Sequence, residues 1–591
     1  MDFTNINDMF RWRVERSGGN IAMMQKTQGR WVNISWNRYY ESVRFIAQGL
    51  RALGIEKGDR VAIFCNTRIE WVFSDMGILG CGGVTVPIYQ SSPTGEIEYI
   101  VNHSDAKIII VENSELLDRV LKVRENLEGL KKIILIDGPA PYEDDDVILI
   151  SDLVEIGRSE KIHKYEDMAK DVSLEDMATI VYTSTSGPQK GVVHTHSQLL
   201  AEQYAINQVL PTNENELTLL FLPLSHIFGR VIEYWNLYSG VKLAFAESYD
   251  RLARNMREVN PHYLAAVPRV LQKIYSIAKQ EADSQGKAKR LLMEWCLDVG
   301  SKVADLKREK RPIPFKLNIE FQAANRVFFD RFRQQFGKNL NRLVCSGAPL
   351  SKEIGSFFDA TGIVVLEAYG LTETAGAVSM NSPGDYKIGS VGKPIPNCEV
   401  KLDVDGEILV KGPNIIREYW KNPEETNALL KDGWFHTGDV GEIDEQGFLR
   451  ITDRKKDLII TSGGKNIAPM NIETQICSDP YIDQVFVHGD KRNFISALIT
   501  LNRLSIENWA EEKGLNYKTY ENLIKSEEVR KLIEEKVYQK NKELAGPETI
   551  KKFAILPNGF TVKGGEITST MKLNRKMIEN KYKDVLDGFY R

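Results

Sequence analysis

Apolar and polar positions alternate along most of the chain in the way typical of α/β proteins. Residues 39–53 carry apolar side chains at helical spacing, and the turn Gly58-Asp59 leads directly into the apolar run 60–64. Residues 84–88 are a further strand candidate. Residues 107–111 and 132–136 each consist of a lysine followed by four apolar residues, as expected of parallel strands that are buried on both faces. Such strands between helices predict a large N-terminal α/β domain of several subdomains.

The pattern changes at a charged stretch, Asp453-Arg454-Lys455-Lys456-Asp457. Short strand-like runs at 484–487 and 495–499 follow it, and a helix begins near Ser526 with two glutamates in its first turn and an apolar face. This later part is predicted to be a small α+β domain. We therefore divide the chain into a large domain over residues 1–452, a hinge over 453–457 and a small, mobile C-terminal domain over 458–591.

Residues 280–335 are helical in pattern and rich in charge. Lysines and arginines surround apolar side chains such as Leu291, Leu292 and Trp295. A solvated helix face is the favoured interpretation. The alternative is a basic amphipathic segment that lies on an anionic membrane surface.

Composition restricts the classes of function. The 591 residues contain 77 basic and 81 acidic side chains, and the formal net charge of -4 argues against a nucleic-acid partner, which would require a basic surplus. The six cysteines are scattered without Cys-x-x-Cys spacing, which predicts reduced thiols and no zinc site. Since we find no signal segment and no apolar run of about 18 residues, we expect a cytoplasmic protein, with peripheral contact at the inner face of the membrane left open.

Candidate chemistry begins at residues 182–191, which read Tyr-Thr-Ser-Thr-Ser-Gly-Pro-Gln-Lys-Gly after the apolar run 177–181. A buried strand leads here into a turn of small residues, whose N–H groups and hydroxyls can bind phosphate oxygens, while Lys190 adds a positive charge. The pattern predicts a nucleoside triphosphate site. It is not a Walker P-loop, because Gly191 follows the lysine and no glycine stands five residues before Gly187.

Four further segments carry polar residues after apolar runs or in turns, and each alone has an ordinary structural explanation. They are 222–230 with His226, 363–373 with Tyr369, Thr372 and Glu373, 434–439 with Asp439, and 566–575 with Lys572. In this order, and with Arg454, they resemble the adenylate-forming superfamily of acyl-CoA synthetases, luciferases and peptide-synthetase adenylation domains. The resemblance runs from about Trp36 to the end of the chain.

Within that superfamily the chain looks most like bacterial long-chain fatty acid-CoA ligases. The similarity rests on Val267-Pro268-Arg269-Val270, the helical segment after it, and residues 453–458. The resemblance implies two half-reactions. A carboxylate first attacks the α-phosphorus of ATP to give an acyl-adenylate and pyrophosphate, and coenzyme A then displaces AMP to form a thioester.

The resemblance also implies a role for each matching residue. Glu373 would hold Mg²⁺, Thr372 would donate to the α-phosphate, and Tyr369 would stack on adenine. The other implied nucleotide-binding residues are Thr183, Ser184, Thr185, Ser186, Gly187 and Lys190 at the β- and γ-phosphates, and Gly347, Ala348, Pro349 and Gly370 around the adenine site.

The remaining roles concern the sugar and the two half-reactions. Asp439 would accept hydrogen bonds from the ribose hydroxyls, and Arg454 would donate to the sugar from the opposite domain. Lys572 would bridge the carboxylate oxygen and the α-phosphate in the first half-reaction only. For the second, the small domain would rotate about Lys456, with Gly463 and Gly464 along the coenzyme A channel and His226 beside the thiol path.

The phosphate loop departs from the family pattern Tyr-Thr-Ser-Gly-Thr-Thr-Gly-x-Pro-Lys-Gly, because this chain lacks the fourth residue and has Gln189 where proline is common. Losing one residue would move Lys190 by up to ~3.5 Å unless the loop re-forms. An active ligase for a long-chain fatty acid is the main hypothesis, because Glu373, Asp439 and Lys572 remain in place. The alternatives are a catalytically impaired, ligand-binding relative and a ligase for an aromatic, short-chain or sterol-like acid.

Overall fold

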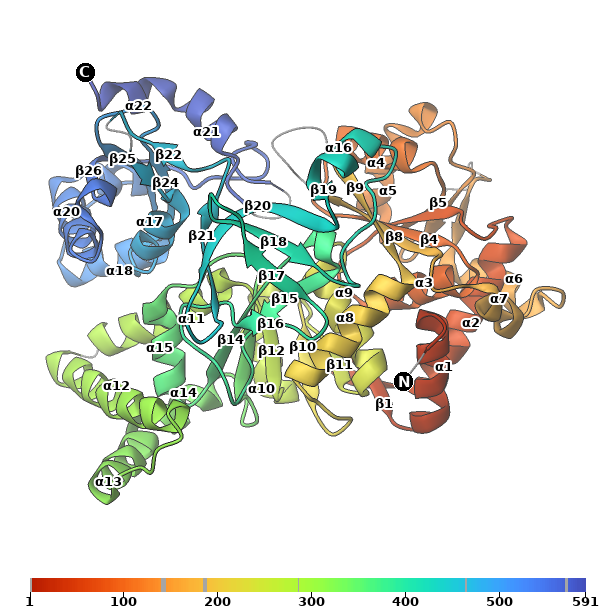
Figure 1. Ribbon diagram of the computed structural model, residues 1–591, viewed down its shortest axis with the longest axis horizontal. Helices are drawn as coiled ribbons and strands as arrows, with labels where there is room; N and C mark the ends of the chain where they lie inside the picture. The colour runs from red at the N-terminus through yellow and green to blue at the C-terminus, as the bar shows by residue number, and fades with distance from the viewer. Residues whose placement is uncertain (1–2, 140–144, 184–188, 285, 463–464, 569–571) are drawn as a thin grey trace.

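The computed structural model describes residues 3–139, 145–183, 189–284, 286–462, 465–568 and 572–591. In Figure 1 the C-terminal elements, in blue, form a lobe at the upper left, and the N-terminal elements, in red and orange, lie on the far right. The larger part of the molecule is built on two large sheets and one smaller sheet.

The first large sheet has seven strands in the order β7-β6-β5-β3-β4-β8-β9, and all neighbours are parallel except β8 and β9. The predicted strands at 60–64 and 84–88 match β3 and β4 residue for residue. The strands are β3 (Arg60–Phe64), β4 (Val84–Ile88), β5 (Ala106–Val111), β6 (Lys132–Leu135), β7 (Val147–Leu149), β8 (Met177–Thr183) and β9 (Lys190–Thr195).

The second large sheet has nine strands in the order β16-β15-β14-β13-β12-β10-β11-β1-β2. Its strands from β14 to β1 are parallel, and antiparallel strands flank them. They are β1 (Ile21–Thr27), β2 (Arg30–Ser35), β10 (Leu217–Leu220), β11 (Lys242–Phe245), β12 (Tyr263–Ala266), β13 (Arg342–Cys345), β14 (Val364–Leu371), β15 (Gly376–Met380) and β16 (Lys393–Pro394).

The largest hydrophobic core lies between these two sheets, because helices with apolar faces fill the space and contact both. These helices are α1 (Ile6–Ser17), α2 (Trp36–Ala52), α3 (Ile69–Gly80), α6 (Ile150–Ser159), α7 (Tyr165–Asp171), α8 (His196–Val209) and α9 (Ile227–Ser239).

Other helices cover the outer faces of the two sheets. On the seven-stranded sheet these are α4 (Thr94–Ser104) and α5 (Ser114–Leu121), and on the nine-stranded sheet α10 (Leu252–Val259), α11 (Pro268–Ser284), α14 (Asp330–Gln334) and α15 (Lys352–Ala360). Figure 1 shows α12 (Lys287–Arg308) and α13 (Phe315–Ala324) extending away from the sheets at the lower left. A π-helix, η3 (Asn325–Phe329), joins α13 to α14, so residues 280–335 are helical as predicted, apart from short connections.

The smaller sheet of the large part is antiparallel and lies beside the C-terminal lobe (Figure 1). Its elements are β17 (Glu399–Leu402), β18 (Glu407–Lys411), β19 (Leu430–Lys431), β20 (Trp434–Ile443) and β21 (Leu449–Arg454), with α16 (Pro423–Leu429) before β19. Asp453 and Arg454 still belong to β21, and Asp453 is fully buried. The chain therefore leaves this sheet at Lys455.

The C-terminal lobe packs helices on a three-stranded sheet, in keeping with the predicted α+β class. Ser526 caps α20 by accepting a hydrogen bond from the Val529 N–H at 3.3 Å, where the sequence predicts a helix start. The elements are β22 (Ile459–Ile460), β23 (Asn466–Ile467), α17 (Pro469–Ile476), β24 (Ile482–His488), β25 (Ile495–Leu501), α18 (Arg503–Glu512), α19 (Tyr520–Ile524), α20 (Glu527–Asn541), β26 (Ile550–Ile555), α21 (Arg575–Lys581) and α22 (Lys583–Gly588).

Across the described ranges, no helix combines the length and hydrophobicity that crossing a membrane requires. All six cysteines are unpaired thiols, and four of them are buried.

Two histidines, His194 in β9 and His196 at the start of α8, give the fold a dependence on pH. His194 and His196 are almost completely buried, and burial lowers the pKa of His194 to about 3 and of His196 to about 4. The unfolded chain takes up protons at these rings near pH 6.5, whereas the folded chain does so only at lower pH. Their contribution to stability is therefore complete above about pH 6.5 and is lost as the pH falls toward 4.

We expect the midpoint of thermal unfolding to fall between about pH 6.5 and pH 4, because only the unfolded state protonates these rings in that range. His194→Leu removes one such ring and should weaken this dependence, as measured by circular dichroism melts across the pH range. A variant with the same pH dependence as the wild type would contradict the assignment.

Candidate active site

A cleft of about 2330 Å³ opens between the large part of the molecule and the C-terminal lobe. A site for one small ligand usually measures about 300–1,000 Å³, so this cleft has room for several substrates together. The predicted site residues that line it are Thr183, Lys190, His226, Gly347, Ala348, Pro349, Tyr369, Gly370, Thr372, Glu373, Asp439, Arg454 and Lys572. The predicted residues Ser184, Thr185, Ser186, Gly187, Gly463 and Gly464 lie outside the described residues.

Neighbouring side chains hold the Asp439 carboxylate in the cleft from two sides. The Tyr369 hydroxyl donates to Asp439 Oδ2 at 2.7 Å, and Arg454 Nε lies 3.1 Å from Asp439 Oδ1. A carboxylate can accept about four hydrogen bonds, so its oxygens can still accept from a ligand. Its side chain is 5% exposed, whereas that of Arg454 is 44% exposed. The arrangement therefore suits a ligand with neighbouring hydroxyl groups.

The expectation that Asp439 and Arg454 approach from opposite domains is wrong. The two residues are direct partners in the antiparallel pair of β20 and β21, within one sheet. Arg454 precedes the point where the chain leaves that sheet. Both groups therefore stay fixed to each other whatever the position of the C-terminal lobe.

Glu373 lies on the short 3₁₀-helix η4 (Thr372–Thr374), directly after β14. The Tyr419 hydroxyl donates to Glu373 Oε1 at 2.9 Å, and the Lys190 ammonium lies 5.6 Å from the centre of the Tyr419 ring and pairs with Glu425. A single carboxylate beside hydroxyl groups suits Mg²⁺, which usually completes its ligands with water and substrate phosphates. The donor set at Glu373 thus fits the implied metal.

Two glycines allow the backbone to line the cleft closely. Gly347 has φ +93°, in the left-handed region that favours glycine, and it begins the predicted Gly347-Ala348-Pro349 segment after β13. A Cβ on Gly370 would lie 1.7 Å from the Gly376 carbonyl oxygen, so β14 and β15 are in contact there and no larger residue fits. This contact fixes the position of the Tyr369 and Thr372 backbone on either side.

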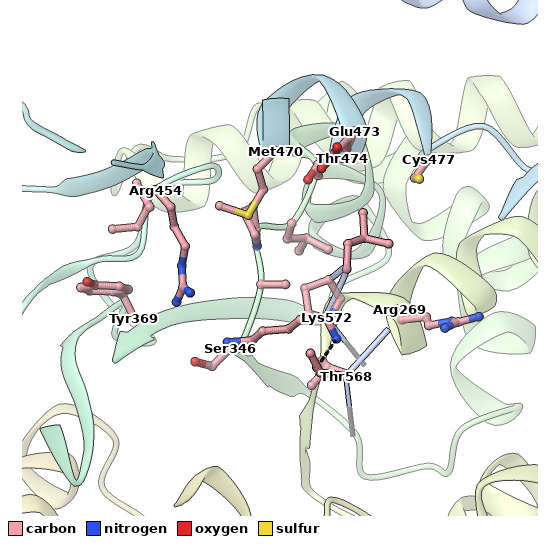
Figure 2. A pocket seen from close by; sticks show the side chains of 18 of the residues that line it. Arg269, Ser346, Tyr369, Arg454, Met470, Glu473, Thr474, Cys477, Thr568 and Lys572 are labelled. Atoms are coloured by element: carbon pink, nitrogen blue, oxygen red, sulfur yellow. Dashed lines mark hydrogen bonds between the residues drawn. The ribbon is translucent and has the colours of Figure 1, made fainter. Parts of the chain in front are cut away.

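Lys572 comes from the C-terminal lobe and faces the large domain. Its N–H donates to Thr568 Oγ1 at 3.1 Å, and Thr568 N–H donates to the Lys572 carbonyl at 2.8 Å, so these two residues hold each other in place (Figure 2). Desolvation by the cleft walls lowers the pKa of Lys572, and Arg454 adds to this, while Asp439 and Glu373 oppose it. Lys572 is nevertheless exposed to water in the cleft.

His226 begins α9, and its Nδ1 accepts a hydrogen bond from the Phe228 N–H at 3.1 Å. Burial, together with the nearby Lys572 charge, lowers the pKa of His226 to about 4. The ring is therefore neutral near pH 7, and Nδ1 is the acceptor nitrogen.

Sequence reasoning missed Tyr419 and Glu425 because they belong to no motif. They reach Glu373 and Lys190 only because residues near 419 pair with β9, which the isolated bridge between Val192 and Tyr419 shows. The sequence near 419 contains aromatic residues, but nothing in the pattern links them to a site more than 200 residues away.

Sequence profiles decide the family. The profile of the AMP-binding enzymes matches residues 10–420, and that of their C-terminal domain matches residues 456–591. The chain belongs to the AMP-binding enzyme family. The resemblance to adenylate-forming enzymes and the predicted fold class are thereby confirmed.

Relatives of this AMP-binding enzyme are similar over nearly their whole length. Long-chain-fatty-acid–CoA ligase FadD15 of Mycobacterium bovis is 35% identical over 593 residues, which cover 98% of this chain and 95% of the relative. Long-chain-fatty-acid–CoA ligase ACSBG1 of Rattus norvegicus is 31% identical over 623 residues, with 99% and 85% covered. The adenylation domain of a carboxylate reductase from Mycobacterium chelonae has the same fold, with a TM-score of 0.80, 20% identity and 99% and 91% covered.

Tyr369→Phe should weaken AMP binding by about 3- to 10-fold, because Asp439 loses the hydroxyl that holds one of its oxygens in place. Isothermal titration with AMP in the absence of Mg²⁺ measures this effect. Tyr419→Phe removes an equivalent hydroxyl from Glu373 and serves as the matched control, with an affinity within about twofold of the wild type. Equal losses in both variants would show that Asp439 does not depend on Tyr369.

Proposed function

We propose that this protein is an AMP-forming ligase that converts a long-chain fatty acid to its coenzyme A thioester through an acyl-adenylate. The observation that carries the proposal is the position of Lys572, which lies in one cleft with Asp439, Arg454 and Glu373 although it belongs to the other part of the chain. The names of the relatives supply the substrate class, since they are long-chain-fatty-acid–CoA ligases. In this proposal ATP and coenzyme A are the co-substrates, and Mg²⁺ is the metal.

In the first half-reaction the fatty-acid carboxylate oxygen attacks the α-phosphorus of ATP, and pyrophosphate leaves. Negative charge builds on the phosphoryl oxygens, and the Lys572 ammonium stabilises it where carboxylate and α-phosphate meet. Thr372 donates to the α-phosphate, while Asp439 and Arg454 hold the ribose. Mg²⁺ held by Glu373 would neutralise phosphate charge. These roles orient the reactants without a proton transfer from the protein.

An apolar branch of the cleft supports an alkyl substrate. Its walls are side chains from α8, α9, β13 and β15: Ile206, Phe228, Val231, Ile232, Trp235, Val344 and Met380. Glu202 also lines this region, accepts hydrogen bonds from Ala377 N–H at 2.5 Å and Asn414 Nδ2 at 2.9 Å, and has its pKa raised to about 8 by burial. Because that carboxyl is largely neutral near pH 7, it places little charge against an alkyl chain.

In the second half-reaction the coenzyme A thiol attacks the acyl carbonyl and AMP leaves. The C-terminal lobe rotates about the hinge near Lys456, which is exposed and therefore loses no buried contact when the backbone turns. Lys572 leaves the cleft in this movement. The neutral His226 ring stays behind, between the apolar branch and the space that Lys572 vacates.

A catalytically impaired, ligand-binding relative is the weaker proposal. The ladder of β8 and β9 continues to the pair Thr183 and Lys190, so both ends of the shortened loop are held together by the sheet. The relatives named as ligases also span nearly the whole chain. The third possibility is a ligase for an aromatic, short-chain or sterol-like acid. The assay that tests the main proposal also tests this one, because it shows which acids cause the release of pyrophosphate.

The purified protein should release pyrophosphate only when a long-chain fatty acid is present, and should form a thioester only when coenzyme A is also present. Lys572→Met should lower adenylate formation by about 100-fold or more, because the charge between carboxylate and α-phosphate is lost. The same variant should convert supplied acyl-adenylate to thioester at close to the wild-type rate.

Two outcomes would contradict these expectations. Absence of pyrophosphate release with every carboxylic acid tested would refute the ligase proposal. Equal loss of both half-reactions in Lys572→Met would refute the role given to Lys572.

Peripheral contact with an anionic membrane surface is a further part of the proposal. Residues 287–316 contain nine basic and four acidic side chains, although the whole chain is acidic. Large apolar side chains in the same segment are exposed, including Leu291 at 51% and Phe315 at 81%, and Ile319, just beyond it, is 55% exposed. Apolar side chains among basic ones, on helices that extend from the fold, suit the headgroup region of an anionic bilayer (Figure 1).

The protein should float with vesicles that contain phosphatidylglycerol, and binding should decrease in high salt because the basic side chains are screened. Leu291→Ser combined with Phe315→Ser should reduce the bound fraction at least about 5-fold by removing apolar area that enters the bilayer. Ile162→Ser, which changes another highly exposed side chain, is the control. Equal binding to phosphatidylcholine vesicles, or no effect of the double change, would refute the contact.

A further inference from the structure

An ionic contact joins the two parts of the molecule at Glu353. Lys540, on α20 of the lobe, pairs through its ammonium with Glu353 Oε2 on α15 of the large domain. The Ser478 hydroxyl, also from the lobe, donates to the same oxygen at 3.3 Å. The Lys540 side chain is 12% exposed and that of Glu353 is 40% exposed, so water is excluded from the ammonium side of the pair more than from the carboxylate side. Because the two charged groups belong to different parts of the molecule, a rotation of the lobe would separate them.

Glu353 is held ready for this contact by its own domain. The Tyr275 hydroxyl donates to Glu353 Oε1 at 2.6 Å, and Lys279 lies 3.5 Å from the same oxygen. Burial would raise the pKa of Glu353, but the bonds from Lys540 and Tyr275 outweigh it and lower the pKa to about 2. The carboxylate is therefore charged at every pH at which the protein is expected to work.

A second pair supports the same placement. Arg269, at the start of α11, lies 3.3 Å from Asp483 on β24 of the lobe. The side chains of Arg269 and Asp483 are both more exposed than that of Lys540. This second pair should therefore stabilise the placement of the lobe less than the pair at Glu353. Neither pair contains a residue to which we assign a chemical role.

The position of Glu353 links the contact to the reaction. Ser351 caps α15, and the Gly347-Ala348-Pro349 segment that lines the cleft immediately precedes this cap. Lys540 and Lys572 both belong to the lobe. When Lys540 meets Glu353, the lobe is placed against the adenine side of the cleft with Lys572 inside it.

We propose that the Glu353–Lys540 pair is a positioning contact that favours the placement of the lobe with Lys572 in the cleft and thereby the first half-reaction. The inference rests on the proposed ligase function. The pair breaks when the lobe rotates, so it does not assist the thioester step. Glu353 and Lys540 act through Lys572 and touch neither substrate.

The test measures the two half-reactions separately in Glu353→Gln, Lys540→Met and the double variant. Each single variant should lower fatty-acid-dependent pyrophosphate release by about 5- to 10-fold. Thioester formation from supplied acyl-adenylate should stay within about twofold of the wild type. The double variant should lose no more than the worse single variant, because both changes remove the same contact.

Lys531→Met is the matched control, because Lys531 lies on the same helix and pairs with Glu527 within the lobe. It should leave both half-reactions unchanged. Raising the salt concentration from about 0.05 to 0.5 M should slow pyrophosphate release by the wild type more than by the double variant.

Each remaining outcome decides against one proposal. If the wild type is active but the single variants keep their pyrophosphate release, or lose both half-reactions equally, the positioning contact is refuted. Additive losses in the double variant also refute it. If the wild type releases no pyrophosphate with any acid, the ligase proposal itself fails, and the variants are not needed to show it.

Discussion

The cleft depends on carboxylates that neighbouring side chains hold in place while their oxygens can still accept from a ligand. Asp439 is fixed from two sides by Tyr369 and Arg454, and Glu373 from one side by Tyr419. A buried carboxylate is costly unless hydrogen bonds and positive charges compensate it. Here the compensating groups all belong to the large domain, so the C-terminal lobe is not needed to hold these carboxylates. Lys572, which is the positive group opposite them, belongs to the lobe.

Much of this arrangement is visible in the sequence. Continuous apolar runs locate β3, β4 and β5 to within a residue, because strands buried on both faces need apolar side chains at every position. Site residues such as Tyr369 and Asp439 were found because they belong to short motifs in a fixed order. All predicted site residues that the structure describes line a single cleft.

The sequence failed where the position of a residue depends on distant partners. Arg454 was expected on the far side of the ribose because it lies in a charged stretch, but backbone pairing places it beside Asp439. Tyr419 and the Glu353–Lys540 pair are invisible for the same reason, since each joins elements far apart along the chain. The charge pattern predicted a hinge, yet it could not show that Asp453 is buried and belongs to the strand before it.

The close contact at Gly370 has a consequence for how such an enzyme could change its substrate. Because the two backbones touch there, the wall that carries Tyr369 and Glu373 cannot be reshaped by enlarging a side chain at that point. The backbone that positions the Tyr369 and Glu373 side chains is therefore fixed at this point. In the apolar branch, by contrast, most of the lining side chains belong to α8 and α9, and these can vary in size without moving a strand. A change in acid specificity is thus separated from the binding of ATP. Substitutions confined to those two helices could change which acid is bound while the residues assigned to ATP stay in place.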